Sequence, residues 1–187
     1  MSQNEAQFPK LRRSDRQVAD DEWIRRFLER APYAIVALHQ EGYPHLVSNI
    51  FYYERATNCI YLHGAKEGET RRAIERDPRA TLTATRMGRL LPAKTATNMS
   101  VEYESVQVRG RVEIMTDIEQ ATEKMQSLVN KYFPHLRRGA DYAEIARSEI
   151  EHITAYCLQI ESWQAKRKQE RADFPGAFRF GEHGFLP

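Results

Sequence analysis

The chain has 187 residues, of which 41% are hydrophobic, 29% charged and 10% aromatic, and its formal net charge is +2. This length and composition fit one folded domain and exclude a globally disordered or collagen-like chain. No apolar run approaches the roughly 20 residues that span a bilayer, and the start of the sequence lacks the apolar core of a secretory signal. We therefore expect a cytoplasmic protein without a membrane partner.

The first part of the chain predicts a polar arm followed by a helix. Residues 1–17 carry basic side chains without sustained periodicity, which indicates an extended arm. In residues 20–31, Trp23, Ile24 and Phe27 recur at the spacing of one helix face, so this segment predicts an amphipathic helix.

Six runs rich in β-branched and aromatic residues predict strands, because turn signals separate them. The runs are residues 33–39, 44–54, 59–65, 80–86, 101–115 and 153–163. Short helices are expected over residues 68–78 and 141–151, and a longer one after Asp117, a suitable N-cap. We expect a mainly β protein with flanking helices, in which residues 18–165 form a small six-stranded antiparallel barrel and 166–187 a tail.

The sequence IYLHGAKEGETRR has the features of an anion site. A predicted strand runs into a turn bracketed by Gly64 and Gly68 and then into the start of a helix. Free backbone N–H groups and the positive end of a helix dipole can hold a phosphate there, with Lys66, Thr70 and Arg71 supplying charge and hydrogen bonds. The alternative is that the glycines only form the turn and the basic side chains are solvated.

Other kinds of site have little support in the sequence. Cys59 and His63 would lie about 13 Å apart on one strand, too far to share a metal ion, so no metal site is expected. Trp163 either caps an aromatic ligand or fills the end of the barrel, and composition favours packing. Tyr103 and Ser105 are ordinary strand residues by periodicity. The basic run at 166–171 lacks interleaved aromatic residues, so no nucleic-acid partner is expected.

The order of several segments resembles the pyridoxamine 5'-phosphate oxidase-like flavoproteins, which have an FMN-binding split barrel. These segments are the Gly42-Tyr43-Pro44 turn, IYLHGAKEG, Asp77-Pro78-Arg79-Ala80 and SVEYESVQVRGRVE. The opening DEWIRRFLER, the His63 turn, Leu91-Pro92, Lys131-Tyr132-Phe133-Pro134 and the final IESWQAK are similar, more narrowly, to the nitroimidazole-resistance branch. The likeness covers roughly residues 10–170.

The resemblance implies a homodimer with two FMN molecules in clefts between the subunits. It implies that Val47, Ser48 and Asn49 lie along the isoalloxazine, and that Gly64, Ala65, Lys66, Gly68, Thr70 and Arg71 hold the phosphate. Tyr103, Ser105 and Trp163 would meet the flavin from the partner subunit. His63 would lie near flavin and substrate as the catalytic residue.

The implied activity is that of an FMN-dependent oxidoreductase acting on a small organic substrate, with nitro-aromatic compounds as one option. A flavin carrier, sensor or storage protein without turnover is the alternative. Ser48 stands where many members have proline, and the last strand lacks the arginine arrangement by which true pyridoxamine-phosphate oxidases recognise their substrate. Some relatives bind deazaflavin or haem, which leaves the cofactor's identity open.

Overall fold

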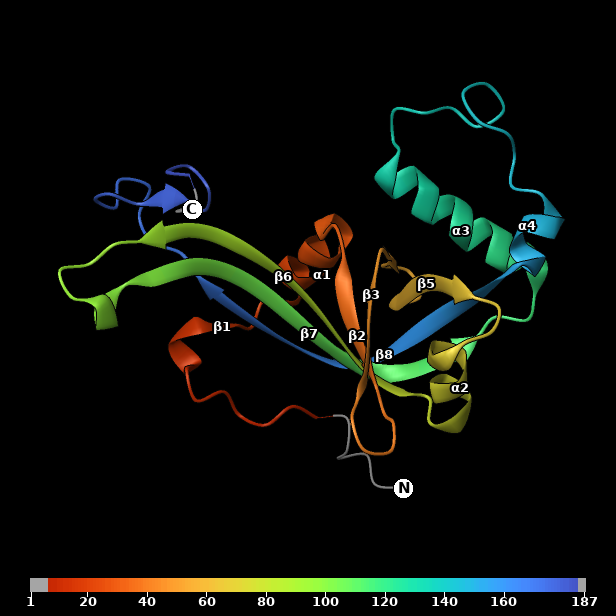
Figure 1. The fold of residues 1–187 in the computed structure, drawn as a ribbon, viewed down its shortest axis with the longest axis horizontal. Coiled ribbons are helices and arrows are strands. Elements are labelled where there is room, and N and C mark those ends of the chain that lie inside the picture. The colour runs from red at the N-terminus through yellow and green to blue at the C-terminus, as the bar shows by residue number, and fades with distance from the viewer. Residues whose placement is uncertain (1–6, 185–187) are drawn as a thin grey trace.

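The computed structural model describes residues 7–184 (Figure 1). Its helices are α1 (Asp21–Arg30), α2 (Glu69–Arg76), α3 (Ile118–Tyr132) and α4 (Arg147–Glu151), with short 3-10 helices at Ser14–Arg16 and Ala96–Asn98. Its strands are β1 (Gln17–Val18), β2 (Ala34–Leu38), β3 (His45–Asn49), β4 (Tyr52–Glu54), β5 (Cys59–Ala65), β6 (Arg79–Leu91), β7 (Ser100–Ile114), β8 (Ile153–Lys168) and β9 (Phe178–Arg179).

The predicted antiparallel sheet with flanking helices is confirmed, but nine strands form within residues 7–184 where six were expected. Two of the additional strands, β1 and β9, have two residues each and pair with β8 and β6. The third arises because the predicted strand at 44–54 is interrupted at Ile50 and Phe51, which separate β3 from β4.

This interruption closes the sheet on itself. The hydrogen-bonded order is β3-β2-β6-β7-β8-β5-β4, so β3 and β4 are its two ends. β3 and β4 form no hydrogen-bonded ladder with each other. The two residues between them along the chain instead connect the two ends of the sheet covalently. Phe51, at the junction, is fully buried.

Two hydrophobic clusters lie on opposite sides of this sheet. The main core includes Val36, Leu38, Ile60, Leu62, Leu82, Val106, Val108 and Leu158, each at most 4% exposed. A smaller cluster contains Cys59, Tyr61 and Cys157 of β5 and β8, packed against Ala121 and Met125 of α3. Successive side chains of β5 therefore pack into two different cores, one inside the barrel and one beneath α3 and α4.

The helix signals are confirmed with one difference. The Asp117 carboxylate accepts from the backbone N–H groups of Glu119 (2.9 Å) and Gln120 (3.1 Å), as expected of the N-cap of α3. The helix expected at 141–151 forms only as α4. Its start coincides with the bond from the Ala146 N–H to the Glu149 carboxylate (2.7 Å), which ties the residue before α4 into the helix's first turn.

The strands β6 and β7 extend beyond the barrel as a long hairpin, to the left in Figure 1, and the chain after β8 packs on this hairpin. Glu102 makes a two-point ion pair with Arg89 (2.7 and 2.9 Å) and accepts from the N–H of Glu170 (2.8 Å). Arg89 also donates to the carbonyls of Arg171 and Ala172. The segment expected as a tail is thus attached to the hairpin, and β8 itself continues through Lys168, past the expected limit of the domain at 165.

A bulge in the pairing of β7 with β8 changes which residues of β8 face the core. Arg109 pairs with Ser162 while Gly110 pairs with Ile160, so Glu161 is an extra residue on β8. Gly110 permits close contact there, since a Cβ would collide with the carbonyl oxygen of Gln159. Before the bulge the even-numbered Leu158 is buried, and after it the odd-numbered Ala165 is buried.

A buried lysine stabilises the junction between β3 and β4. The Lys131 ammonium donates to the carbonyls of Phe51 (2.9 Å) and Leu28 (3.4 Å) and lies 3.9 Å from the centre of the Phe51 ring. The neighbouring Tyr132 hydroxyl accepts from the Phe51 N–H (3.1 Å) and donates to the Pro32 carbonyl (2.8 Å). Burial lowers the pKa of Lys131 to about 8.

We predict that Lys131 makes the free energy of unfolding depend on pH in the alkaline range. Between the folded pKa of about 8 and the ordinary value of 10.5, the unfolded chain binds more protons at this lysine than the folded chain does. The free energy of unfolding of the wild type should therefore rise relative to that of Lys131→Met from pH 8 to pH 10.5. Urea unfolding across this range measures it, with Lys94→Met as the exposed-lysine control. A constant difference between wild type and Lys131→Met would contradict the assignment.

Candidate anion site between strand β5 and helix α2

The turn between β5 and α2 leaves the first backbone N–H groups of the helix available. Gly68 is the N-cap of α2 and has no side chain that could accept from the first turn. Its φ of +140° is a conformation that glycine adopts readily, and a Cβ there would meet nothing within 4 Å. An anion can thus approach this backbone closely, at the positive end of the helix dipole.

Two cationic side chains flank this turn. The Lys66 ammonium donates to the Glu151 carbonyl (2.6 Å), at the end of α4. The Arg71 guanidinium pairs with Glu75 (2.8 Å) and makes longer contacts of 3.3 Å with the Lys66 carbonyl and the Thr154 hydroxyl. Within the described residues Lys66 has no carboxylate partner, so one positive charge beside the turn is not neutralised by an ion pair.

A cavity of about 250 Å³ lies beside Lys66 and Arg71, beneath α3 and α4. Its walls are largely apolar, from Ile114, Ile150 and Ile153, and the hydroxyl of the buried Thr154 is at its cationic side. Sequence reasoning missed Glu151 and Thr154. They lie about 85 residues from the turn in sequence, and no local pattern connects them to it.

Strand β3 is linked to the same turn by two side-chain bonds. His45 Nε2 lies 3.0 Å from the Thr70 hydroxyl, and the Asn49 amide donates to the His63 carbonyl (2.6 Å). The first contact joins β3 to α2, and the second crosses the gap between β3 and β5, which share no ladder. Val47 shares the face of His45 and Asn49, whereas Ser48 points to the opposite, exposed face. Sequence reasoning did not name His45. The alternation of HLVSN places it on the same strand face as Val47 and Asn49, which could have identified it as a site residue.

The end of β5 carries the remaining residues expected at this turn. The Nδ1 atom of His63 is buried without a hydrogen-bond partner, and burial lowers the pKa of this histidine. Gly64 leaves room for the buried ring of Tyr156, which would lie 3.2 Å from a Cβ at this position. Ala65 is the exposed last residue of the strand. Burial therefore favours the neutral form of the His63 imidazole.

Tyr103, Ser105 and Trp163 lie away from this turn. Ala155, the β8 partner of His63, precedes Trp163 by eight residues, or about 26 Å along the strand. Ser105 pairs with Lys166, still further along β8. Trp163 Nε1 donates to Asp21 (2.8 Å), and the Tyr103 hydroxyl accepts from Arg16 (3.3 Å). One chain thus brings together the expected residues from Val47 to Arg71 except Ser48, but not these three.

Two further searches of the structure were negative. Over residues 7–184, no three or more His, Cys, Asp or Glu side chains gather in a way that could hold a metal ion. In the same part of the chain, no helix is long and apolar enough to cross a membrane.

A sequence model of the family described as pyridoxamine 5'-phosphate oxidase matches residues 20–167. The chain belongs to this family. The match covers the barrel, the β5–α2 turn and the helices α1 to α4, and it places the protein among flavin-binding split barrels. Among curated proteins, no sequence matches the chain.

Several solved structures share the family's fold. The flavocytochrome Anf3 of Azotobacter vinelandii is 23% identical, with a TM-score of 0.74 over 95% of this chain and 85% of that one. A FAD- and haem-binding protein of Mycobacterium smegmatis is 22% identical, with a TM-score of 0.73 over 84% and 76%. A Bacteroides thetaiotaomicron protein, described as a 5-nitroimidazole antibiotic resistance protein, is 20% identical, with a TM-score of 0.67 over 81% and 86%.

Proposed function

We propose that this family member is an FMN-dependent oxidoreductase that acts on a small organic substrate. The observation that carries the proposal is the uncapped start of α2, where the Gly68 backbone is open to close approach and Lys66 and Arg71 flank the turn. This arrangement fits a terminal phosphate better than a neutral ligand, because the dipole, N–H groups and cations all favour negative charge. A bound flavin supplies the electron-transfer chemistry, so the protein needs mainly to bind and orient it.

The residues around the turn have separate roles in this proposal. Lys66 and Arg71 neutralise the phosphate, and Thr70, held by His45, contributes its hydroxyl. Val47 and Asn49 lie on the β3 face that also carries His45, which suits contact with the ring system. His63, whose neutral form is favoured by burial, is in this proposal the residue that bonds to flavin or substrate without adding a charge.

A nitro-aromatic compound is the substrate class we favour. The likeness to the Bacteroides protein described as a nitroimidazole resistance protein supports this choice. The likeness to the Mycobacterium smegmatis protein described as binding FAD and haem makes FAD the main competitor of FMN in any binding experiment.

We predict that Arg71→Ala weakens FMN binding by about tenfold to hundredfold, since one charge-assisted hydrogen bond contributes about 1.5–3 kcal/mol. Calorimetric titration of the flavin-free protein with FMN measures this, and riboflavin should bind the wild type more weakly than FMN. Arg72→Ala is the matched control, because Arg72 is the next residue of α2 and its one ion pair over residues 7–184 is with Glu69 on the surface.

Equal affinity of the wild type for riboflavin and FMN would contradict a phosphate site at this turn. So would full FMN affinity in Arg71→Ala. If FAD binds more tightly than FMN, the proposed cofactor becomes FAD, while the proposed anion site at this turn is retained. Melting temperatures of both variants separate a lost phosphate contact from lost folding, because Arg71 also contacts Glu75 and Thr154.

We predict that His63→Ala leaves the protein folded and largely flavin-loaded but changes the rate at which reduced flavin is reoxidised by a nitro-aromatic substrate. The reason is that the proposal places the His63 ring beside the flavin and its substrate, while its buried Nδ1 makes no hydrogen bond that holds the fold together. Stopped-flow absorbance after reduction with NADH or NADPH gives the rate. His63→Gln, which keeps a hydrogen-bonding group, should restore part of it. A fall in melting temperature with unchanged reoxidation would identify His63 as a packing residue.

The proposal includes a homodimer in which Tyr103, Ser105 and Trp163 of one subunit approach the flavin of the other. Its support is that these three residues cannot reach the turn of their own chain. Closed twofold symmetry is the commonest way to build such a shared site. Light scattering of the flavin-loaded protein should give twice the chain mass of 21.8 kDa. A monomer that retains flavin would contradict it, and flavin that is bound but never reoxidised by substrate would favour the carrier or sensor alternative.

A further inference from the structure

The hydroxyl of Tyr156 is buried in the barrel core without a hydrogen bond. Tyr156 is 2% exposed, and its hydroxyl oxygen has no hydrogen-bond partner among residues 7–184. Buried hydroxyls are normally hydrogen-bonded, because burial removes them from water and an unmade bond is then costly. The groups around this hydroxyl therefore indicate what can complete its bonding.

The side chain of Tyr156 is directed along the sheet toward the β5–α2 turn. In the ladder between β5 and β8, Tyr156 pairs with Leu62, and Gly64 pairs with Thr154. The ring nevertheless lies against Gly64, since a Cβ on this glycine would be 3.2 Å from Cε2 and 3.8 Å from the hydroxyl oxygen of Tyr156. The hydroxyl thus reaches the register of Gly64 and Thr154, one pair before the end of the ladder.

Thr154 can supply the acceptor that the Tyr156 hydroxyl lacks. Its side chain is 3% exposed and lies on the same face of β8, two residues before Tyr156. The Thr154 hydroxyl accepts from Arg71 and donates to the Lys66 carbonyl. Because a hydroxyl oxygen has two lone pairs, Thr154 can accept a second bond, from Tyr156. Burial raises the pKa of Tyr156, and the Thr154 hydroxyl and Arg71 guanidinium oppose this rise from close by.

The bonds between Thr154 and the cationic side of the turn are all long. Arg71 Nη1 lies 3.3 Å from both the Thr154 hydroxyl and the Lys66 carbonyl, and Thr154 lies 3.4 Å from that carbonyl. Hydrogen bonds from nitrogen to oxygen are usually 2.7–3.2 Å long. The short bond of Arg71, at 2.8 Å, goes instead to the exposed Glu75. Long bonds and one unmade bond thus meet at Thr154, and Arg71 is not held there in one orientation.

We propose that Tyr156 is a positioning residue of the anion site, whose hydroxyl donates to Thr154 when Lys66 and Arg71 bind a phosphate. Thr154 then joins three groups, accepting from Tyr156 and Arg71 and donating to the Lys66 carbonyl, and it holds Arg71 toward the turn. The bond from Tyr156 forms on binding, so it contributes to the affinity for phosphate and not to folding. This inference rests on the proposed function, which supplies the phosphate at this turn.

The test is Tyr156→Phe, which removes the hydroxyl and keeps the ring. In calorimetric titrations of the flavin-free, full-length protein, the variant should bind FMN about threefold to tenfold more weakly than the wild type, as expected for one neutral hydrogen bond. Its affinity for riboflavin, which has no phosphate, should not change. Its melting temperature without flavin should be at least that of the wild type, because no bond of the flavin-free protein is lost.

Tyr53→Phe is the matched control. Tyr53 is also 2% exposed, but its hydroxyl is bonded to Arg25 (2.8 Å) and Asn58 (3.0 Å), toward the other end of β5. This variant should have a lower melting temperature and an unchanged affinity for FMN. A second measurement combines Tyr156→Phe with Arg71→Ala. If Tyr156 acts by positioning Arg71, its removal should change the FMN affinity of Arg71→Ala by less than twofold.

The inference is overturned if Tyr156→Phe binds FMN as the wild type does, or if it weakens FMN and riboflavin binding equally. It is also overturned if the variant's flavin-free melting temperature falls as far as that of Tyr53→Phe, since the hydroxyl would then be bonded without a phosphate. An equal effect of Tyr156→Phe with and without Arg71 would exclude the positioning role. A wild type that prefers FMN to riboflavin, with an unaltered Tyr156→Phe, refutes this inference alone, whereas equal wild-type affinities refute the phosphate site and this inference together.

Discussion

The closure of the barrel depends on the bonds that hold the chain at Phe51. The two ends of the hydrogen-bonded sheet meet there without a ladder, so the backbone groups of this residue have no strand partner on that side. Lys131 and Tyr132, from the end of α3, supply the missing donor and acceptor. Because the same two side chains also bond to the carbonyls of Leu28 and Pro32, they attach α1 and the entry to β2 to the same point. One turn of one helix thereby positions β3, and β3 positions the β5–α2 turn through His45 and Asn49.

This arrangement explains why the candidate site combines a rigid half and an adjustable half. Thr70, Asn49 and the His63 backbone are held by short bonds between regular elements. Lys66 and Arg71 instead bond to a carbonyl at the end of the five-residue helix α4, to the first residues of β8 and to an exposed glutamate. The long, flexible cations can exchange these partners for an anion at modest cost, while the backbone that would receive the anion stays fixed.

Much of the fold could be predicted from the sequence because the responsible interactions are local. The apolar spacing predicts both α1 and α3, and Asp117 predicts the start of α3. The limits predicted for β5 are the observed ones because its ends coincide with turn residues. The interruption at Ile50–Phe51 could not be predicted, since no proline or glycine marks it. The chain is held there by a bond from Lys131, about 80 residues away.

The residues of the β5–α2 turn could likewise be grouped from the sequence, because glycines, a lysine and a helix start within nine residues suffice to indicate an anion site. The partners Glu151 and Thr154 and the position of Arg16 beside Tyr103 depend on strand pairing between distant segments. Periodicity gives no information on such pairing. The resemblance to a known family named Tyr103, Ser105 and Trp163, but their neighbours within one chain became visible only in three dimensions.

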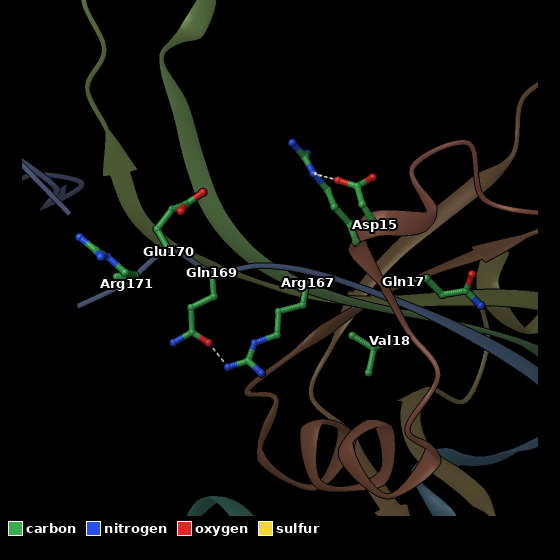
Figure 2. A pocket seen from close by; sticks show the side chains of 8 residues that line it. Asp15, Gln17, Val18, Arg167, Gln169, Glu170 and Arg171 are labelled. Atoms are coloured by element: carbon green, nitrogen blue, oxygen red, sulfur yellow. Dashed lines mark hydrogen bonds and ion pairs between the residues drawn. The ribbon is translucent and has the colours of Figure 1, made fainter. Parts of the chain in front are cut away.

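The extra residue at Glu161 reverses the inside-out alternation of β8 halfway along its length. A simple two-residue period, carried through from Tyr156 and Leu158, would assign Trp163, Ala165 and Arg167 to the outer face. The bulge instead turns Trp163 and Ala165 toward the core and, with them, Arg167 toward a surface hollow between β1 and the end of β8 (Figure 2). A single inserted amino acid thus lets one continuous strand present its odd-numbered side chains to the helix-covered outer cluster at one end and to the barrel core at the other. Which side chains the C-terminal half of β8 presents to solvent consequently depends on the presence of this extra residue as much as on the identity of the residues that follow it.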